Sequence, residues 1–321
     1  MRILGLSSFK HDTAAALLEE GKITAAIEND KLVRSRTSGL PKAAIGFCFN
    51  AASVGWDSLD LIAVATQPLK GSLRRSALHA KLCMVAPLAG AYCEANEIGT
   101  LARDLNNLRI LCRHTNGAPR KVVGFEEHLC HAASSFFLSG FDRALIVTSD
   151  EDGDGNSGML AVGEGTRIRV LRRIPFPNSL AWVYSQVTDL VGFLSHQEEH
   201  KTQWFGMEGE PVYKHVFLKM LRRDAKRPWP ELDYSFFNRG LVRRIAFSDK
   251  FYHETGLPSE PTRLRAGQRT ALARSIQEAC CEVVADLVEY YRHQEGIQQV
   301  CFAGGWGDKG QMSGAQLGRG V

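Results

Sequence analysis

The fold of this chain is decided by residues 3–27, which read ILGLSSFKHDTAAALLEEGKITAAI. Apolar runs at residues 3–6, 14–18 and 23–27 are separated by a polar segment and by the turn sequence Glu20-Gly21-Lys22. Short β-prone runs bounded by glycine and polar residues are typical of strands joined in hairpins. We therefore expect a strand, a polar loop, a second strand, a tight turn and a third strand.

The same order of runs returns in residues 144–171, which read ALIVTSDEDGDGNSGMLAVGEGTRIRVL. The apolar runs here flank a Gly- and Asp-rich segment at residues 150–156 and a second turn at residues 163–165. Self-similarity of this kind indicates two copies of one structural unit. The three expected strands of the second copy are residues 144–148, 159–162 and 168–171.

Helical patterns follow each of the two units. In these segments apolar residues recur at helical spacing, and the first of them begins directly after Pro41, which favours the first turn of a helix. The expected helices are residues 42–52, 180–193, 266–291 and most of 70–120, and two further strands are expected at residues 61–65 and 300–303.

Two hairpin units with helices behind each, followed by an apolar strand that runs into Gly304-Gly305, predict an α/β protein. Their order matches the duplicated ribonuclease H-like fold of actin, Hsp70 and the sugar kinases. We expect a first lobe with a helical insertion at residues 1–125 and a second, incomplete lobe at residues 126–305. Residues 306–321 are expected to form an irregular tail, as a frameshift or truncation would produce.

The composition of the 321 residues is that of a soluble globular protein, with 44% hydrophobic residues and a formal net charge of +4. This charge is too small to indicate DNA binding, and no apolar stretch is long enough for a membrane helix. The N-terminus does not have the pattern of a signal peptide. We expect a cytoplasmic protein in which Cys48, Cys112 and Cys301 are buried thiols, and in which basic pairs such as Arg74-Arg75 lie on a solvated face.

The segment from Glu126 to Ser134 reads EEHLCHAAS and carries the strongest candidate site. On a helix, Glu127 and His131 would lie one turn apart on one face, which suits two ligands of a transition metal. His128 is three residues from His131 and would share that face. The alternative is the start of a helix in which acids complement the dipole and the histidines are partly buried.

A second candidate is the acidic segment Asp150-Glu151-Asp152-Gly153-Asp154-Gly155. Its spacing resembles the start of an EF-hand, but the twelfth loop position is Ala161 instead of an acid, which excludes that motif. Carboxylates this close repel one another unless a cation or protons intervene. We expect Asp150 to bind metal and the four residues 152–155 to face a nucleotide, whereas the alternative is a polar hairpin loop.

The remaining candidates lie in two polar segments and a glycine pair. In residues 7–13, Ser7 offers a hydroxyl for a phosphate, His11 a general base and Asp12 an acid that orients it. In the run Glu198-Glu199-His200-Lys201, Lys201 would reach a phosphate or carbamoyl oxygen. Gly304 and Gly305 would let backbone approach a nucleotide closely. For His11 and Asp12 the alternative is a purely structural pair, and for the run Glu198-Glu199-His200-Lys201 it is a solvated row of charges.

Together these segments resemble the O-carbamoyltransferase family, which includes the nodulation-factor and antibiotic carbamoyltransferases. Residues 128–134, HLCHAAS, are similar to the metal motif HHLAHAAS of that family, and Lys10-His11-Asp12-Thr13-Ala14-Ala15 is similar to its His-Asp-Ser-Ala-Ala loop. The other resembling segments are residues 3–7, 28–34, 179–192, 199–201, 247–258 and 303–305.

The resemblance implies a two-module enzyme. A YrdC-like module makes carbamoyladenylate from ATP and carbamoyl phosphate, and the N-terminal module passes the carbamoyl group to a hydroxyl of a small-molecule or saccharide acceptor. A bound divalent metal, iron in the family and with Mg²⁺ as a further candidate, would be held by Glu127, His131 and Asp150. His11, Asp12, His128 and Lys201 would then be catalytic, with His11 near the acceptor and Lys201 on the adenylate.

Three departures from the family pattern leave alternatives open. Glu127 replaces the first histidine of the metal motif, Glu151 stands where the family often has glycine, and the pattern stops after Gly305. A YrdC-like module would then have to act in trans. The alternatives are a nucleotide-binding subunit without catalysis and a relative of the enzymes that transfer threonylcarbamoyl to tRNA.

Overall fold

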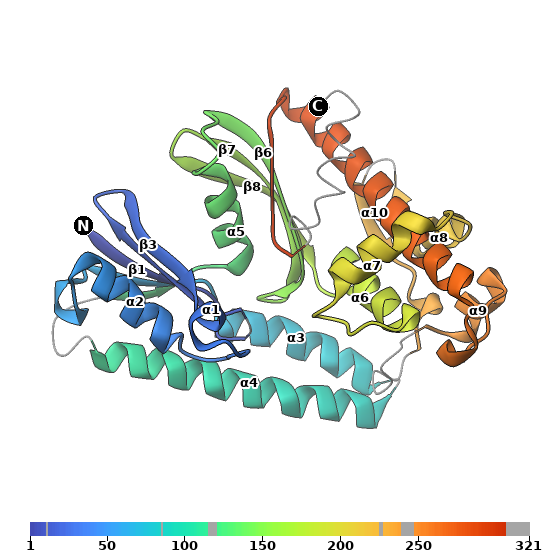
Figure 1. The fold of residues 1–321 in the computed structure, drawn as a ribbon, viewed down its shortest axis with the longest axis horizontal. Coiled ribbons are helices and arrows are strands. Elements are labelled where there is room, and N and C mark those ends of the chain that lie inside the picture. The colour runs from blue at the N-terminus through green and yellow to red at the C-terminus, as the bar shows by residue number, and fades with distance from the viewer. Residues whose placement is uncertain (11, 85, 115–120, 225–226, 239–246, 306–321) are drawn as a thin grey trace. The chain divides into compact units, whose positions relative to one another are not determined.

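The computed structural model describes residues 1–10, 12–84, 86–114, 121–224, 227–238 and 247–305. The chain has mixed α/β structure with two main sheets, one of five strands and one of four (Figure 1). Contacts within the chain divide it into two compact units. The first comprises residues 1–80 and 91–130, and the second comprises residues 81–90 and 131–321.

The five-stranded sheet of the first unit has the order β3-β2-β1-β4-β5. The first three strands are antiparallel neighbours, and β1, β4 and β5 are parallel. Glu20 and Gly21 join β2 to β3 with φ values of 48° and 79°, as a two-residue hairpin turn requires. The strands are β1 (Arg2–Leu6), β2 (Ala14–Glu19), β3 (Lys22–Glu28), β4 (Leu61–Val64) and β5 (Lys121–Gly124).

Helix α2 (Lys42–Ala52) has the predicted bounds and covers this sheet. The side chain of Asn29, in the short helix α1 (Asn29–Val33), accepts hydrogen bonds at 3.1 Å from the backbone N–H groups of Ala43 and Ala44. These bonds satisfy donors that the first turn of a helix leaves without partners. Ile45 and Phe49, one turn apart, then pack into the core.

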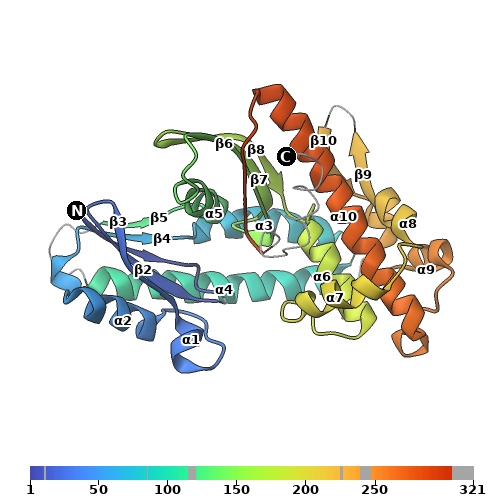
Figure 2. The ribbon, with the colours of Figure 1, turned by 45° about the horizontal axis from the view of Figure 1, so that its top comes forward.

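Two long helices, α3 (Pro68–Cys83) and α4 (Pro87–His114), confirm the helical prediction for most of residues 70–120 (Figures 1 and 2). The guanidinium of Arg75 donates to both carboxylate oxygens of Glu97 at 2.7 and 3.0 Å, and His79 pairs with Glu94 at 2.9 Å. Since residue numbers rise along one helix as they fall along the other, the pair is antiparallel. Arg75 lies in this seam and not on a solvated face, so that prediction was wrong.

The four-stranded sheet of the second unit has the order β11-β6-β7-β8. The strands β6, β7 and β8 are antiparallel neighbours, and β11 is parallel to β6. This repeats the order and directions of β4-β1-β2-β3 in the first unit. The strands are β6 (Arg143–Gly153), β7 (Asn156–Glu164), β8 (Arg167–Pro175) and β11 (Val300–Ala303).

The acidic segment corrects one prediction. We expected a loop over residues 150–156, but β6 continues to Gly153 across a bulge after Ser149, and only Asp154 and Gly155 form the turn. Both turn residues have positive φ, 54° and 76°, which is the geometry of a tight hairpin turn. Ladder pairing of Gly153 with Asn156 therefore shortens the loop to two residues.

Helices α6 (Leu180–Val191) and α10 (Ala266–Glu295) form the core of the second unit. The buried hydroxyl of Tyr184 donates to the side-chain carbonyl of Gln277 at 2.9 Å and joins the two helices. The smaller elements around them are α5 (Glu127–Phe136), α7 (Glu199–Phe205), α8 (Lys214–Met220), α9 (Asp249–Thr255), β9 (Leu221–Asp224) and β10 (Arg227–Leu232).

The cysteines are free thiols. Cys48 and Cys301 are buried as predicted, and burial raises the pKa of both thiols. Cys112 is exposed on α4, so the prediction of its burial was wrong. Among the described helices, none combines the length and apolarity needed to span a bilayer.

Candidate metal centre

Helix α5 carries two of the candidate ligands, Glu127 and His131, one turn apart. The C-terminal half of the helix is anchored on β7 by Phe136, whose ring lies over Gly163. A Cβ at Gly163 would come within 2.6 Å of three ring carbons, so only glycine allows this approach. The packing fixes the helix against the sheet that carries Asp150.

Asp150 is held in place from three sides at the bulge in β6. Its Oδ1 accepts a hydrogen bond from the backbone N–H of Glu151 at 2.7 Å, and Oδ2 lies 3.5 Å from the N–H of Gly305. Its carbonyl accepts from the hydroxyl of Ser179, the N-cap of α6, at 2.9 Å. Backbone and side-chain donors therefore orient this carboxylate before any cation binds.

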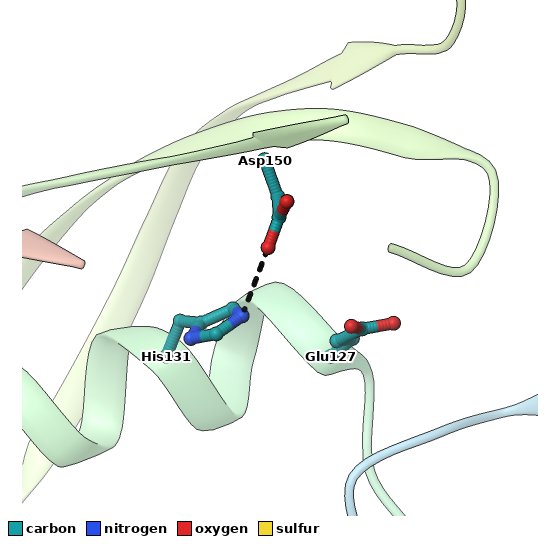
Figure 3. A group of neighbouring side chains, drawn as sticks. All are labelled: Glu127, His131 and Asp150. Carbon is teal, nitrogen blue, oxygen red and sulfur yellow. Dashed lines mark ion pairs between the residues drawn. The ribbon is translucent and has the colours of Figure 1, made fainter. Parts of the chain in front are cut away.

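The three side chains Glu127, His131 and Asp150 converge (Figure 3). Nε2 of His131 lies 3.6 Å from Oδ2 of Asp150, and one donor atom of each residue lies within 4.8 Å of the others. A metal with ligand bonds of about 2.1 Å at tetrahedral angles separates its donors by about 3.4 Å. The His–Asp separation fits this value, and Glu127 offers the third donor atom of the group. One imidazole nitrogen and two carboxylate oxygens suit a divalent transition metal.

The turn after β11 closes over the same strand. Gly304 has φ of 87°, and a Cβ there would lie 2.4 Å from the carbonyl oxygen of Ser149. Ser149 is buried, and its hydroxyl has no hydrogen-bond partner among the described residues. Close approach of the β6 backbone therefore requires glycine at position 304. The predicted approach of this glycine pair to a nucleotide stays a prediction.

A second contact at the acidic segment was not predicted from the sequence. Nδ1 of His196 lies 2.7 Å from Oε2 of Glu151, and this hydrogen bond raises the pKa of the imidazole. The backbone N–H of His196 donates to Glu199 at the start of α7. No local pattern reveals the pair, because 44 residues lie between its members.

The other predicted site residues have varied surroundings. His128 is fully buried on α5, Asp12 is exposed with φ of 49°, and Lys201 is half-exposed and paired with Glu198. The hydroxyl of Ser7 accepts from the N–H of Ala14 at 2.8 Å and closes the loop between β1 and β2. His11 lies outside the described residues.

Of the predicted nucleotide-facing residues, Asp152 and Gly153 end β6, and Asp154 and Gly155 form the turn to β7. Asp152 accepts a hydrogen bond from the N–H of Gly155 at 2.8 Å, and Asp154 is buried. Gly153 pairs with Asn156 at the end of the ladder. The N–H of Gly305, another predicted cofactor-binding residue, lies 3.5 Å from Oδ2 of Asp150, one of the three candidate ligands.

Comparison with known proteins adds the family. Residues 2–320 match the protein family described as Carbamoyltransferase N-terminus. The nodulation protein NolNO of Sinorhizobium fredii is 27% identical over 317 residues, which are 98% of this chain and 43% of NolNO. The Synechocystis protein sll1178 is 28% identical over 313 residues, which are 94% of this chain and 50% of sll1178.

Among solved structures, HypF of T. kodakarensis aligns with 98% of this chain and 43% of its own length, at 10% identity and a TM-score of 0.48. The chain spans about half the length of the curated relatives it matches. Since one family description covers residues 2–320, this chain belongs to the family of carbamoyltransferase N-terminal modules.

Proposed function

We propose that this chain transfers a carbamoyl group from carbamoyladenylate to a hydroxyl of a small-molecule or saccharide acceptor. The observation that carries the proposal is the convergence of Glu127, His131 and Asp150 within 4.8 Å in a chain of this family. Carbamoyladenylate would come from ATP and carbamoyl phosphate through a YrdC-like module or protein.

The two sheets support a nucleotide-binding fold for this reaction. We assign them as two ribonuclease H-like units, because β3-β2-β1-β4 and β8-β7-β6-β11 agree in order and direction. Among the described residues, β11 has no neighbour corresponding to β5, so the second unit has one strand fewer. Within the second unit, the adenylate would meet residues 152–155 together with Gly304 and Gly305. Ser7, in the β1–β2 loop of the first unit, stays a proposed phosphate contact on the family resemblance alone.

The triad would hold a divalent metal. Bound there, the metal would act as a Lewis acid on the carbamoyl carbonyl. The chain's own contribution is to fix the ligands, since Glu151 and Ser179 orient Asp150 and the packing of Phe136 on Gly163 fixes α5. Iron is the expected metal by family resemblance, and the set of one nitrogen and two oxygens also accommodates Mn²⁺ or Zn²⁺.

The remaining roles follow the resemblance. His11, oriented by Asp12, would take the proton of the acceptor hydroxyl, and Lys201 would neutralise an adenylate or carbamoyl oxygen after leaving Glu198. The fully buried His128 lies beside the ligands on α5, which favours a role in holding Glu127 and His131 in place over contact with substrate.

Metal content tests the triad directly. The purified protein should contain about one transition-metal ion per chain by elemental analysis, and His131→Ala and Asp150→Asn should each lower this content by about tenfold or more, as expected for loss of one of three ligands. His200→Ala, an exposed histidine on α7, is the control. Full metal content in both ligand variants would contradict the assignment.

Carbamoyl transfer needs its own assay. Carbamoyladenylate made in situ by a YrdC-like protein is offered with a panel of hydroxylated acceptors, and carbamoylated product is measured by mass spectrometry. Product that disappears with His131→Ala supports the proposal. Nucleotide binding without transfer would instead indicate a binding subunit, and product that forms on tRNA only when threonine is supplied would indicate the threonylcarbamoyl reaction.

A further inference from the structure

Helix α4 presents an apolar stripe to solvent. The positions Ala91, Ala95, Ile98, Ala102 and Leu105 are all exposed, Ile98 to 60%. Their spacing alternates four, three, four and three residues, which is the spacing of the contact positions in a coiled coil. Alanine also suits an exposed helix because of its high helix propensity, but Ile98 and Leu105 on the same line leave aliphatic surface in water.

The inner face of α4 is occupied by ion pairs instead. Glu97 bonds Arg75 of α3 at 2.7 Å, and Glu94 bonds His79 at 2.9 Å and Ser76 at 2.8 Å. The two-helix insertion is thus charged where its helices meet and apolar on an outer face. This is the reverse of a hairpin that is stable on its own in water, and it indicates that the apolar face is covered by another surface.

Helix α3 extends the same face. Each residue of an α-helix is turned by about 100° around the helix axis from the one before it. On α4, the stripe therefore lies about 100° around the axis from the face that meets α3. On α3, the exposed positions that lie about 100° around the axis, in the same direction, from the face that meets α4 are Leu69, Leu73, Ala77 and Ala80. Because the two helices are antiparallel, both sets of residues face the same side of the helix pair. Leu73, 72% exposed, therefore adds to the stripe of α4.

We propose that this face binds a second copy of the chain, with α4 antiparallel to α4 of its partner copy. A two-fold axis near Thr100 would set each aliphatic side chain on an alanine: Ile98 on Ala102 and Leu105 on Ala95, each pair occurring twice. Small residues opposite large ones let two helices approach closely. Because Arg75 of α3 lies beside Glu97 of α4, Leu73 lies at the height of residues 99–100 along the helix pair. The same two-fold axis would therefore bring Leu73 of one copy against Leu73 of the other.

The size of the face agrees with a weak dimer. The axis near Thr100 pairs residues 91–109 of α4 with themselves, a stretch of about 27 Å, and residues 69–80 of α3 span about 17 Å, at 1.5 Å per residue. With helices about 10 Å wide, the two copies would cover roughly 900 Å² in total, just below the area of about 1,000 Å² that a stable specific interface needs. The predicted association is therefore transient, not obligate.

Sedimentation of the whole 321-residue chain over a concentration series tests the association. We expect a monomer–dimer equilibrium, and Ile98→Glu or Ala102→Glu should raise its Kd by at least about tenfold, because each places two carboxylates in the contact. Val212→Glu changes an equally exposed aliphatic residue elsewhere and should leave the Kd unchanged. A monomer at all concentrations, or dimers insensitive to both α4 variants, would overturn the proposal.

Cross-linking tests the register even if a glutamate variant fails to fold. Positions 95 and 105 lie about 15 Å apart on one helix, too far for an internal disulfide. In the proposed dimer they face each other across the axis, so Ala95→Cys with Leu105→Cys should give a covalent dimer under mild oxidation. Either single variant and the wild type, whose Cys112 is also exposed, should remain uncross-linked. A double variant that stays monomeric would contradict the antiparallel register.

Discussion

The imidazole Nδ1 of His196 lies 2.7 Å from Oε2 of Glu151, the residue that follows Asp150 in β6. The contact ties the segment before α7 to the strand that carries a candidate metal ligand. Glu151 is one of the positions at which the sequence was expected to depart from the family pattern. Its carboxylate has a hydrogen-bond partner in His196, and this pair has measurable consequences.

The pair predicts a pH-dependent contribution to stability. The hydrogen bond to Glu151 raises the pKa of His196 in the folded protein, so the stabilisation is complete below the ordinary histidine pKa of about 6.5 and is lost as pH rises through the raised value. Because the imidazole is more than half exposed, the gain is small, from a few tenths to about 1 kcal/mol.

Urea unfolding of metal-free protein between about pH 5.5 and 8.5 measures the contribution of the His196–Glu151 pair to the free energy of unfolding. The difference between wild type and Glu151→Gln should be largest at the acid end of this range and should vanish at the alkaline end. Glu164→Gln, in which the lost partner is Arg143 and not a histidine, is the control and should show no such trend. A difference that grows toward alkaline pH would contradict the assignment.

Replacement of Gly304 should destabilise the second unit strongly. In Gly304→Ala the added methyl would lie 2.4 Å from the carbonyl oxygen of Ser149, and the residue would also keep a positive φ. We expect a loss of about 2–4 kcal/mol in the free energy of unfolding, combining steric conflict and backbone strain and measured by urea unfolding. Gly296→Ala is a matched control. Gly296 also has positive φ, but no atom lies within 4 Å of the position that a Cβ would take there, so this change should cost about 1 kcal/mol.

The strands and helices that were predicted have local signals, whereas short elements such as β5, β9, β10, α8 and α9 were not predicted. Residues 42–52 follow a proline and repeat apolar residues at helical spacing, and the structure has a helix with those bounds. The acidic segment was less predictable, since its carboxylates favour a loop by composition. The ladder between β6 and β7 overrides that preference and leaves only Asp154 and Gly155 in the turn.

The site was predictable only where its residues are close in sequence. Glu127 and His131 are one helical turn apart, so their shared face follows from their spacing, and the structure brings Asp150 to them. The contacts that orient these ligands come from distant residues. Ser179 reaches Asp150 across 29 positions and has no pattern that would predict the contact.

Removal of the Ser179 hydroxyl should affect both stability and metal binding. The side chain accepts from the N–H of Trp182 at 3.0 Å as the cap of α6 and donates to the carbonyl of Asp150 at 2.9 Å. Ser179→Ala should therefore cost about 1 kcal/mol and weaken metal affinity by about tenfold, measured by urea unfolding and by metal titration. Asp233→Ala removes the cap of another helical turn and should lower stability without changing metal affinity.

The ion pair between Arg75 and Glu97 should dominate the stability of the α3–α4 insertion. Burial tends to raise the pKa of Glu97, but the hydrogen bonds and charge of Arg75 outweigh it, and the net pKa is lowered. The contribution is then present above the ordinary glutamate pKa of about 4.3 and is lost as pH falls through the lowered value. Glu97→Ala should cost about 3–5 kcal/mol at pH 7, because the largely buried guanidinium loses both of its hydrogen bonds to Glu97.

A double variant separates loss of charge pairing from loss of packing. Arg75→Met with Glu97→Leu removes both charges and keeps the volume, so it should recover most of the stability lost in Glu97→Ala. Glu254→Ala, which breaks the exposed pair with Lys219, should leave the free energy of unfolding nearly unchanged. If the double variant were as unstable as Glu97→Ala, packing around these side chains, and not the broken charge pair, would explain the loss.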